Sequence, residues 1–371
     1  MFPAEHLTSE ALNKQAKALG GCNQDILERC LYALTLLGHL ADSGLPFVFK
    51  GGSSLLLHLP QVRRLSIDID IVCGEKPTVV DEVVARIGGL PPFIRSEEHV
   101  REHVIKLPHR RHFKFTYRSA IGSQPEVPIL LDVVEESRIP HQVVERPIQT
   151  SFLKPEREIK VKLPTVESLL GDKLTAFAPT TVGVQLRTPE GQPGDVMQVT
   201  KQLFDIGVLF DAATNYAEVA ATYDAVHRLE SEYRGNKHSR DACLADTFQA
   251  CLAVTATRKR ELAVYPDAPL LQSGFQSLRG HLTWRGFTAT PEPKRTIAAR
   301  AAVLVAHLRA DVPFDFGSTR YTGSAEQIQS VRAVTLNGTP LAWIDGVKAV
   351  NPEAYYYWHR AIQLSALAFS L

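Results

Sequence analysis

Hydrophobic residues in the first part of the chain follow two different spacings. Over residues 8–19 and 24–43 they recur every three or four positions, which predicts two helices. Residues 47–49 form a short hydrophobic run that predicts a buried strand. Residues 66–72 (SIDIDIV) alternate between polar and hydrophobic, as in a strand with one buried face. The hydrophobic run at 55–57, between these two strands, predicts a short helix.

The spacing changes at Pro164. Before it, the pattern predicts a short helix over 78–87 and strands over 103–107, 112–118, 127–134, 142–153 and 157–162. After it, the clearest helices are predicted over 165–174, 201–209, 221–232, 242–257, 296–309 and 353–367. We therefore predict an α/β (α+β) domain with a mixed sheet over residues 1–164, followed by a helical domain over 165–371. Residues 179–197 are rich in Pro, Gly and Thr and predict a long loop, either an insertion or a mobile lid.

Gly51 and Gly52 come directly after the first predicted strand and before the predicted helix. Glycine permits a tight turn there, and the first N–H groups of a helix can bind an anionic phosphate. Ser53 or Ser54 can cap that helix or contact the phosphate. Two glycines alone are weak evidence, because such pairs occur in many turns.

Asp68 and Asp70 are two positions apart in the next predicted strand, so both carboxylates are expected on one face. Two neighbouring carboxylates repel each other, and burying them without a partner is costly. Mg²⁺ removes that repulsion, and it prefers carboxylates together with substrate phosphates. The alternative is a pair of aspartates on a solvated strand edge. The order strand, GGSS, helix, S-x-D-x-D favours a phosphate cradle beside a metal site.

These motifs resemble the signature of the AbiEii/AbiGii toxin family of nucleotidyltransferases, relatives of the polymerase-β-type nucleotidyltransferase superfamily. The resemblance rests on K-G-G-S-S-L at 50–55 and R-L-S-I-D-I-D-I at 64–71. Ser54 departs from the pattern, which commonly has alanine there. The resemblance implies a polymerase-β-type nucleotidyltransferase domain whose nucleotide-binding residues are Gly51, Gly52, Ser53, Arg64, Ser66 and a lysine further along the chain.

In the superfamily that this chain resembles, a third carboxylate on a neighbouring strand completes the metal site. Asp132, in the hydrophobic strand predicted over 127–134, is the candidate. Alternatively, Asp132 faces solvent at a strand end, and the adjacent Glu135 or Glu136 can be mistaken for it. The resemblance thus implies Mg²⁺, in a one- or two-metal site, held by Asp68, Asp70 and Asp132.

Two motifs in the predicted helical domain also resemble the family. Residues 167–174 fit E-x-L-x-x-x-K-L, and residues 201–209 fit K-x-x-x-D-hydrophobic-x-x-L. The family's lysine falls on Lys173, and the resemblance implies that it contacts the nucleotide phosphates and offsets charge during transfer. The acid falls on Asp205, which either pairs with Lys173 or acts as base toward the acceptor hydroxyl. The alternative for both is a surface charge on an amphipathic helix.

Basic and aromatic residues alternate over 101–118, where the aromatic ones are Phe113, Phe115 and Tyr117. This mixture suits a nucleic acid, because basic groups bind phosphates and aromatic rings stack on bases. The alternative is a sheet with a solvated basic face. Residues 99–103 also fit an H-x-x-E-H zinc pattern, but they adjoin a predicted strand and lack a further ligand, so we do not expect zinc chemistry. The aromatic residues 355–358 are expected in the core or a domain contact.

Composition adds limits on the class of protein. The 371 residues are 44% hydrophobic and 22% charged, which is ordinary for globular domains. The net charge of +1 provides no overall attraction to nucleic acid, so such binding needs a local basic patch. Five scattered cysteines without C-x-x-C spacing predict a reducing compartment and argue against structural zinc. Without a signal-peptide pattern or a long apolar run, we expect a cytoplasmic protein.

The motifs together predict a Mg²⁺-dependent nucleotidyltransferase whose active site lies in a cleft between the two domains. The resemblance further implies the toxin of a toxin–antitoxin pair, of the abortive-infection type, with a cognate antitoxin as partner. It implies an NTP donor, an RNA acceptor (the tRNA 3′ end) and blocked translation. Two alternatives stay open. One is modification of a protein or small molecule. The other is a non-catalytic nucleotide-binding regulator, against which the intact Asp68 and Asp70 argue.

Overall fold

The computed structural model describes residues 7–100, 108–122, 124–284 and 286–368. The chain divides into two compact units. Unit 1 comprises Met1–Thr165 and Gly280–Arg285, and unit 2 comprises Val166–Arg279 and Gly286–Leu371. The short return of the chain to unit 1 was not predicted. The strand predicted over 103–107 and most of the H-x-x-E-H pattern lie outside the described residues.

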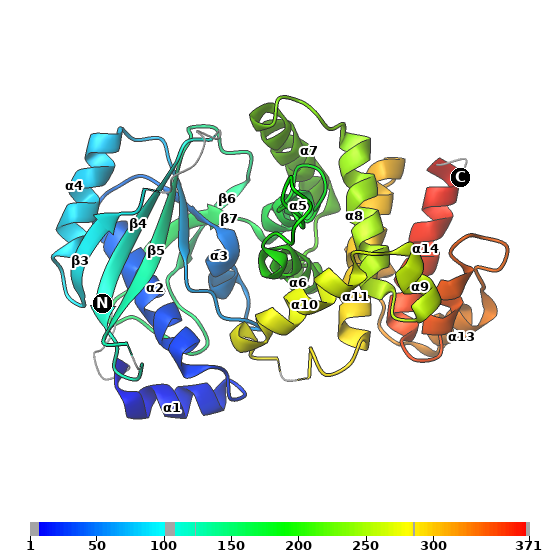
Figure 1. Cartoon of the computed structure of the whole chain (residues 1–371), viewed down its shortest axis with the longest axis horizontal. Helices are drawn as coiled ribbons and strands as arrows, with labels where there is room; N and C mark the ends of the chain where they lie inside the picture. The colour runs from blue at the N-terminus through cyan, green and yellow to red at the C-terminus, as the bar shows by residue number, and fades with distance from the viewer. Residues whose placement is uncertain (1–6, 101–107, 123, 285, 369–371) are drawn as a thin grey trace. The chain divides into compact units, whose positions relative to one another are not determined.

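A five-stranded mixed sheet of order β1-β2-β5-β4-β3 forms the centre of unit 1 (Figure 1). Its strands are β1 (Val48–Lys50), β2 (Ile69–Cys73), β3 (Phe93–Glu98), β4 (Arg110–Arg118) and β5 (Glu126–Glu135). β2 and β5 are parallel, whereas the other neighbouring pairs are antiparallel. A separate two-stranded sheet pairs β6 (Val143–Pro147) with β7 (Lys160–Pro164). The predicted mixed α/β fold class is confirmed, although β3 was not predicted from the sequence.

The helices of unit 1 are α1 (Ser9–Ala18), α2 (Gln24–Asp42), α3 (Gly51–His58) and α4 (Pro77–Gly88). The side chains of Thr8 and Asn23 cap the first two helices, which explains why their starts are clear in the sequence. Side chains of β2 and β5 alternate, so that Ile69, Ile71 and Leu131 are buried in the core. The polar residues between them lie on the opposite face of the sheet.

A buried carboxylate on α2 links this helix to the end of β4 through hydrogen bonds. Glu28 is 2% exposed and accepts hydrogen bonds from the Tyr117 hydroxyl (3.2 Å), the Ser119 hydroxyl (2.7 Å) and the Ala120 N–H (2.7 Å). The Tyr117 ring stacks on Tyr32, with ring centroids 3.5 Å apart. These contacts satisfy a charge that would otherwise be costly to bury.

The interpretation of the aromatic residues in 101–118 as base-stacking groups is wrong. Phe113, Phe115 and Tyr117 are all at most 2% exposed and belong to the core. They alternate with basic residues because alternate side chains of β4 point to opposite faces. Arg111 lies on the same face as these aromatic residues, where its guanidinium lies over the Phe113 ring and forms ion pairs with Glu98 and Asp81. The other basic residues of the strand, Arg110, Lys114 and Arg118, lie on the opposite face. The alternative, a sheet with basic residues on one face, fits this strand.

The second predicted strand begins later than the alternating pattern indicates. β2 starts at Ile69, so Ser66 and Asp68 precede it. The chain just before them is instead hydrogen-bonded to the returning segment: the Leu65 N–H donates to His281 O (2.7 Å), and the Thr283 N–H donates to Arg63 O (3.0 Å). The prediction that Asp68 and Asp70 share one strand is therefore wrong, since Asp68 lies outside β2.

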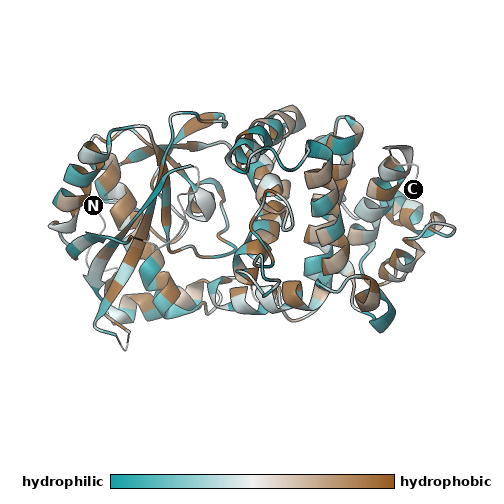
Figure 2. Cartoon of the chain, turned by 45° about the horizontal axis from the view of Figure 1, so that its top comes forward, coloured by the Kyte–Doolittle hydropathy of each residue, from teal (hydrophilic) through white to brown (hydrophobic). Residues whose placement is uncertain are grey.

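Unit 2 is helical. Its α-helices are α5 (Val166–Ala176), α6 (Val196–Ala212), α7 (Tyr216–Tyr233), α8 (Arg240–Thr255), α9 (Lys259–Val264), α10 (Ala268–Leu278), α11 (Glu292–Ala310), α12 (Phe316–Thr319), α13 (Ala325–Ala333) and α14 (Pro352–Ala368). Short 3₁₀ helices are η2 (Arg279–His281), where the chain passes into unit 1, and η3 (Ala342–Val347). Tyr355, Tyr357 and Trp358 are fully buried, so the expected core role of the aromatic run is confirmed for them. In Figure 2, brown hydrophobic residues follow the strands and helices, whereas teal residues gather on many of the turns.

The segment between α5 and α6 is a loop, as predicted, and it packs against its own unit. The Thr180 N–H and the Thr181 hydroxyl both donate to the Asp246 carboxylate at 2.8 Å. Val182 and Leu186 are each 2% exposed. These contacts support an ordered insertion rather than a lid. None of the helices in the described part of the chain is long and apolar enough to cross a membrane.

We predict that Glu28→Ala lowers the midpoint of thermal unfolding by roughly 5 °C, because it leaves buried donors without an acceptor. The exposed Glu97→Ala on β3 is the control and should change it by less than about 1 °C. The measurement is thermal unfolding followed by circular dichroism. Equal midpoints for the two variants would show that the Glu28 contacts contribute little.

Candidate active site

Two carboxylates meet where β2 and β5 run side by side. Asp70 and Asp132 are direct partners in the parallel register. Neighbouring strands are about 4.8 Å apart, and partners in a ladder point to the same face, so the two side chains are adjacent. Both residues are half-buried. The third predicted carboxylate, Asp68, lies just before β2 and is also half-buried.

His112 contacts Asp132 from the other side. It is the partner of Asp132 in the antiparallel β4–β5 pair, and its Nδ1 lies 2.7 Å from Asp132 Oδ1. The two side chains are 14% and 27% exposed. Sequence reasoning missed His112, although its place in the alternation of β4, opposite to the buried aromatic residues, puts it on the carboxylate face.

Gly51 lies against the Asp70 carboxylate. Its φ is +75°, a conformation that favours glycine, and an added Cβ would lie 2.0 Å from Asp70 Oδ2. Gly51 also begins α3, and the N-cap residue Lys50 makes no side-chain hydrogen bond to this helix start. N–H groups at a helix start, next to a carboxylate pair, form the kind of anion cradle predicted for Gly51 and Gly52.

Arg64 lies over the second glycine. It is 5% exposed, and a Cβ on Gly52 would be 2.2 Å from Arg64 Nη2. The residues leading to Arg64 are held by the returning segment, where Arg64 itself forms an isolated bridge with Leu282. The guanidinium is therefore brought to the first turn of α3, as the nucleotide-binding assignment of Arg64 requires.

The serine side chains of the motif face inward. Ser53 is 1% exposed, and its hydroxyl donates to the Asp68 carbonyl oxygen. The Ser54 hydroxyl donates to the Gly51 carbonyl oxygen at 2.7 Å. Ser66 is 4% exposed. The hydroxyl of Ser53 thus positions the chain at Asp68, and a contact between Ser53 and phosphate would use its backbone N–H.

The carboxylates fit a magnesium ion only in part. Within residues 7–100, 108–122, 124–284 and 286–368, no group of three or more His, Cys, Asp or Glu residues is placed to hold a metal ion. The predicted set of Asp68, Asp70 and Asp132 is therefore not assembled as three ligands. Asp70 and Asp132 nevertheless provide two adjacent carboxylates, and Mg²⁺ is commonly bound by one or two carboxylates together with substrate phosphates.

All five cysteines are free and buried. Cys30, near Arg64, is fully buried, and burial raises the pKa of its thiol to about 12. It therefore remains protonated at neutral pH and takes no part in the carboxylate site.

Unit 2 carries the other two predicted residues. Lys173 on α5 lies with its Nζ 3.4 Å from Asp205 Oδ2 on α6, and the same Nζ donates to Gln202 Oε1 at 2.8 Å. The side chains of Lys173 and Asp205 are 9% and 0% exposed, so neither is a surface charge. Since a base must contact the acceptor hydroxyl, the full burial of Asp205 favours pairing with Lys173 over the role of base.

These features define a protein of the nucleotidyltransferase class: a mixed sheet with paired carboxylates beside a glycine-started helix. A family model described as "Nucleotidyl transferase AbiEii toxin, Type IV TA system" matches residues 35–300, well over half of the chain. The chain therefore belongs to the AbiEii nucleotidyltransferase toxin family. The match spans parts of both units, which confirms the resemblance inferred from the motifs.

Solved structures of low similarity were also found. A candidate nucleotidyltransferase from H. pylori is 13% identical, covers 77% of this chain and 96% of its own, and has a TM-score of 0.38. An antigenic nucleotidyltransferase-like protein from Paracoccidioides brasiliensis is 14% identical, covers 58% of this chain and 91% of its own, and has a TM-score of 0.36. A search of curated proteins gave no match.

We predict that Gly51→Ala reduces nucleotidyl transfer by at least about 100-fold, because the new methyl group collides with the Asp70 carboxylate. The matched control is Gly44→Ala. Gly44 also has a positive φ, of +80°, but an added Cβ there meets no atom within 4 Å. Both variants carry similar backbone strain of about 1 kcal/mol. Equal activity in the two would rule out the Asp70 collision as the cause of any loss.

We further predict that Lys173→Met destabilises unit 2 by about 3 kcal/mol or more, because it removes the ammonium that lies 3.4 Å from the buried Asp205 carboxylate. The double variant Lys173→Met, Asp205→Leu should recover much of that loss, since neither charge remains. Thermal unfolding of both variants tests this. If the double variant is no more stable than the single one, the uncompensated charge is not the source of the instability.

Proposed function

We propose that this protein transfers a nucleoside monophosphate from an NTP to the 3′ end of an RNA acceptor, namely tRNA, and thereby blocks translation. The family supplies the reaction class, nucleotidyl transfer by a toxin of type IV toxin–antitoxin systems. The acceptor is proposed from the resemblance to such toxins. A cognate antitoxin is the expected partner in the cell.

One observation carries the proposal: Asp70 and Asp132 are register partners on parallel strands, and Asp70 lies against Gly51 at the start of α3. Phosphoryl transfer relies on positioning and charge stabilisation, which require anion-binding donors next to carboxylates. This arrangement supports chemistry on a nucleotide more than it supports a regulatory role. A regulator has no need for Asp70 to lie against a glycine.

In the proposed reaction, the first N–H groups of α3 and the Arg64 guanidinium bind the β- and γ-phosphates of the donor. The acceptor hydroxyl attacks the α-phosphorus, and its proton passes to Asp132, which His112 orients through its hydrogen bond. Mg²⁺, held by Asp70 and Asp132 with Asp68 nearby, would neutralise charge on the phosphates when bound. Pyrophosphate then leaves from the α3 side.

Lys173 and Asp205 have a different role in the proposal. Asp205 and Gln202 hold the Lys173 ammonium in a fixed position. Lys173 then offers a preorganised cation to the donor phosphates, as the resemblance implies. Asp205 is in this view a positioning residue that acts through Lys173.

The test is incubation of the purified protein with total tRNA, Mg²⁺ and each α-labelled NTP in turn. We expect label on RNA with one preferred NTP, and loss of label with EDTA. Asp70→Asn, which keeps the side-chain shape but removes the charge, should lower transfer at least about 100-fold. The control Asp25→Asn alters an exposed aspartate at the start of α2 and should leave the rate within about twofold.

Absence of label on RNA, with folded protein, would refute the RNA acceptor. Parallel reactions with total protein and with small hydroxylated molecules would then identify the other acceptor classes. Equal transfer by Asp70→Asn and wild type would refute the assignment of the carboxylate pair, whichever acceptor is used.

A further inference from the structure

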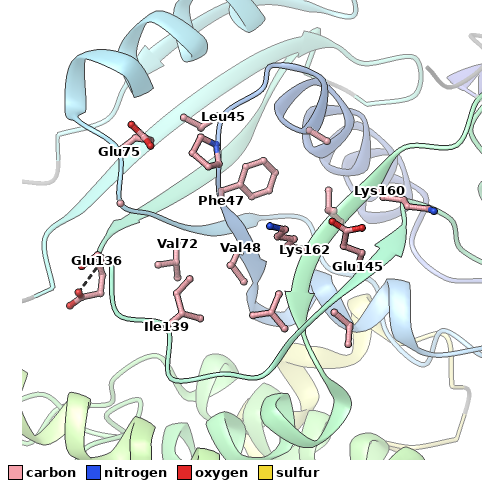
Figure 3. A pocket seen from close by; sticks show the side chains of 17 residues that line it. Leu45, Phe47, Val48, Val72, Glu75, Glu136, Ile139, Glu145, Lys160 and Lys162 are labelled. Carbon is pink, nitrogen blue, oxygen red and sulfur yellow. Dashed lines mark hydrogen bonds between the residues drawn. The ribbon is translucent and has the colours of Figure 1, made fainter.

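Unit 1 has a cavity of about 780 Å³ that the proposed function does not yet use (Figure 3). This volume is in the range of small-ligand sites in proteins, about 300–1,000 Å³. It lies between the start of β1, the end of β2, the chain after β5, and the β6–β7 hairpin. Its walls include the hydrophobic residues Phe47, Val48, Val72, Ile139 and Val143.

The cavity adjoins the carboxylates along the same face of the sheet. Val72 is two positions from Asp70, and Val48 is two positions from Lys50, so each pair points the same way. Val48 is the register partner of Val72, and Lys50 is the partner of Asp70. Residues two apart on a strand are separated by about 7 Å. The edge of the cavity is therefore one such step from Asp70.

Three features thus follow one another along β1 and β2. The start of α3 comes directly after Lys50, at one end. The paired residues Lys50 and Asp70 are in the middle, and Asp132 lies beside Asp70 on β5. Val48, Val72 and the cavity are at the other end. The phosphate cradle and the cavity therefore lie on opposite sides of the carboxylates.

This order assigns a side to each substrate. In an in-line displacement the attacking and departing oxygens lie on opposite sides of the phosphorus. If pyrophosphate leaves from the α3 side, the acceptor hydroxyl must enter from the side of Val48 and Val72. We propose that the cavity binds the terminal nucleoside of the RNA acceptor, an assignment that rests on the proposed function.

The lining suits a nucleobase. Val48, Val72 and Ile139 supply apolar surface for the faces of a planar ring, and Figure 3 shows them close together along the cavity. Glu145 and Lys162 are register partners across β6 and β7, and both line the same cavity. A carboxylate accepts from base N–H groups and an ammonium donates to base carbonyls, so this pair can contact the edge of the base.

The proposed transfer forms one bond to phosphorus and breaks one. A ribose hydroxyl oxygen of the bound nucleoside forms a bond to the α-phosphorus of the donor, and the bond from that phosphorus to the oxygen bridging to the β-phosphate breaks. The hydroxyl proton passes to Asp132. The products are RNA longer by one nucleotide and pyrophosphate.

The test fills the cavity with an indole group. Ile139 is 42% exposed, so Ile139→Trp can be accommodated without rebuilding the core. The matched control is Ile94→Trp on β3, at the other edge of the sheet and 39% exposed. We expect Ile139→Trp to raise the KM for tRNA about tenfold or more and to leave the KM for NTP within about twofold. Ile94→Trp should change neither constant by more than about twofold.

A raised KM for NTP with an unchanged KM for tRNA would overturn the proposal and assign the cavity to the donor nucleoside. KM values for tRNA and NTP equal to those of Ile94→Trp would also overturn the proposal. If Ile139→Trp does not fold, Val143→Trp tests the same wall, since Val143 is 38% exposed.

Binding of a labelled oligoribonucleotide with the tRNA 3′ sequence separates this proposal from the proposed function. Weaker binding to Ile139→Trp alone would support the cavity as an RNA site even if wild-type protein transfers no nucleotide. Equal binding to wild type and both variants would overturn the cavity assignment even if transfer is observed.

Discussion

The parallel register of β2 with β5 is the constraint on which the site depends. It sets Asp70 beside Asp132, and a shift by one residue would turn one of the two carboxylates to the opposite face. The register is held by the other face of the sheet, where Ile69, Ile71 and Leu131 are fully buried. Gly51 then fixes the distance from the start of α3, since any larger residue would collide with Asp70. The hydrophobic core thus positions the polar site.

The second unit holds its predicted residues by a different means. Lys173 and Asp205 are almost completely buried, and Gln202 shares the ammonium. Desolvating such a pair is expensive, and apolar residues of similar size are often as stable. Stability alone therefore does not account for its presence. This agrees with the family motif that singled out both residues.

Sequence reasoning failed where a sequence pattern had two physical explanations. The alternation of basic and aromatic residues in 110–118 fits nucleic-acid binding and equally fits a strand with a buried face. Only the burial of Phe113, Phe115 and Tyr117 decides between them. Similarly, the alternation in 66–72 fits a strand throughout, but β2 begins only at Ile69, and Leu65 before it is hydrogen-bonded to His281 in a distant segment. Strand limits depend on long-range partners that local spacing does not contain.

The sequence by itself determined the helices of unit 1 and the helices α5, α6, α7, α8, α11 and α14 of unit 2, but not α9, α10, α12 or α13. It also determined the change of architecture near Pro164, the glycine–serine and aspartate motifs, and through them the family. These are local properties, because capping, hydrophobic period and motif spacing act within about ten residues. Only the tertiary structure decided that His112 contacts Asp132, that Ser53 faces inward, that residues 281–283 support Arg64, and where the cavity lies. Each of these joins segments far apart in the chain, and their contacts follow from strand order and register.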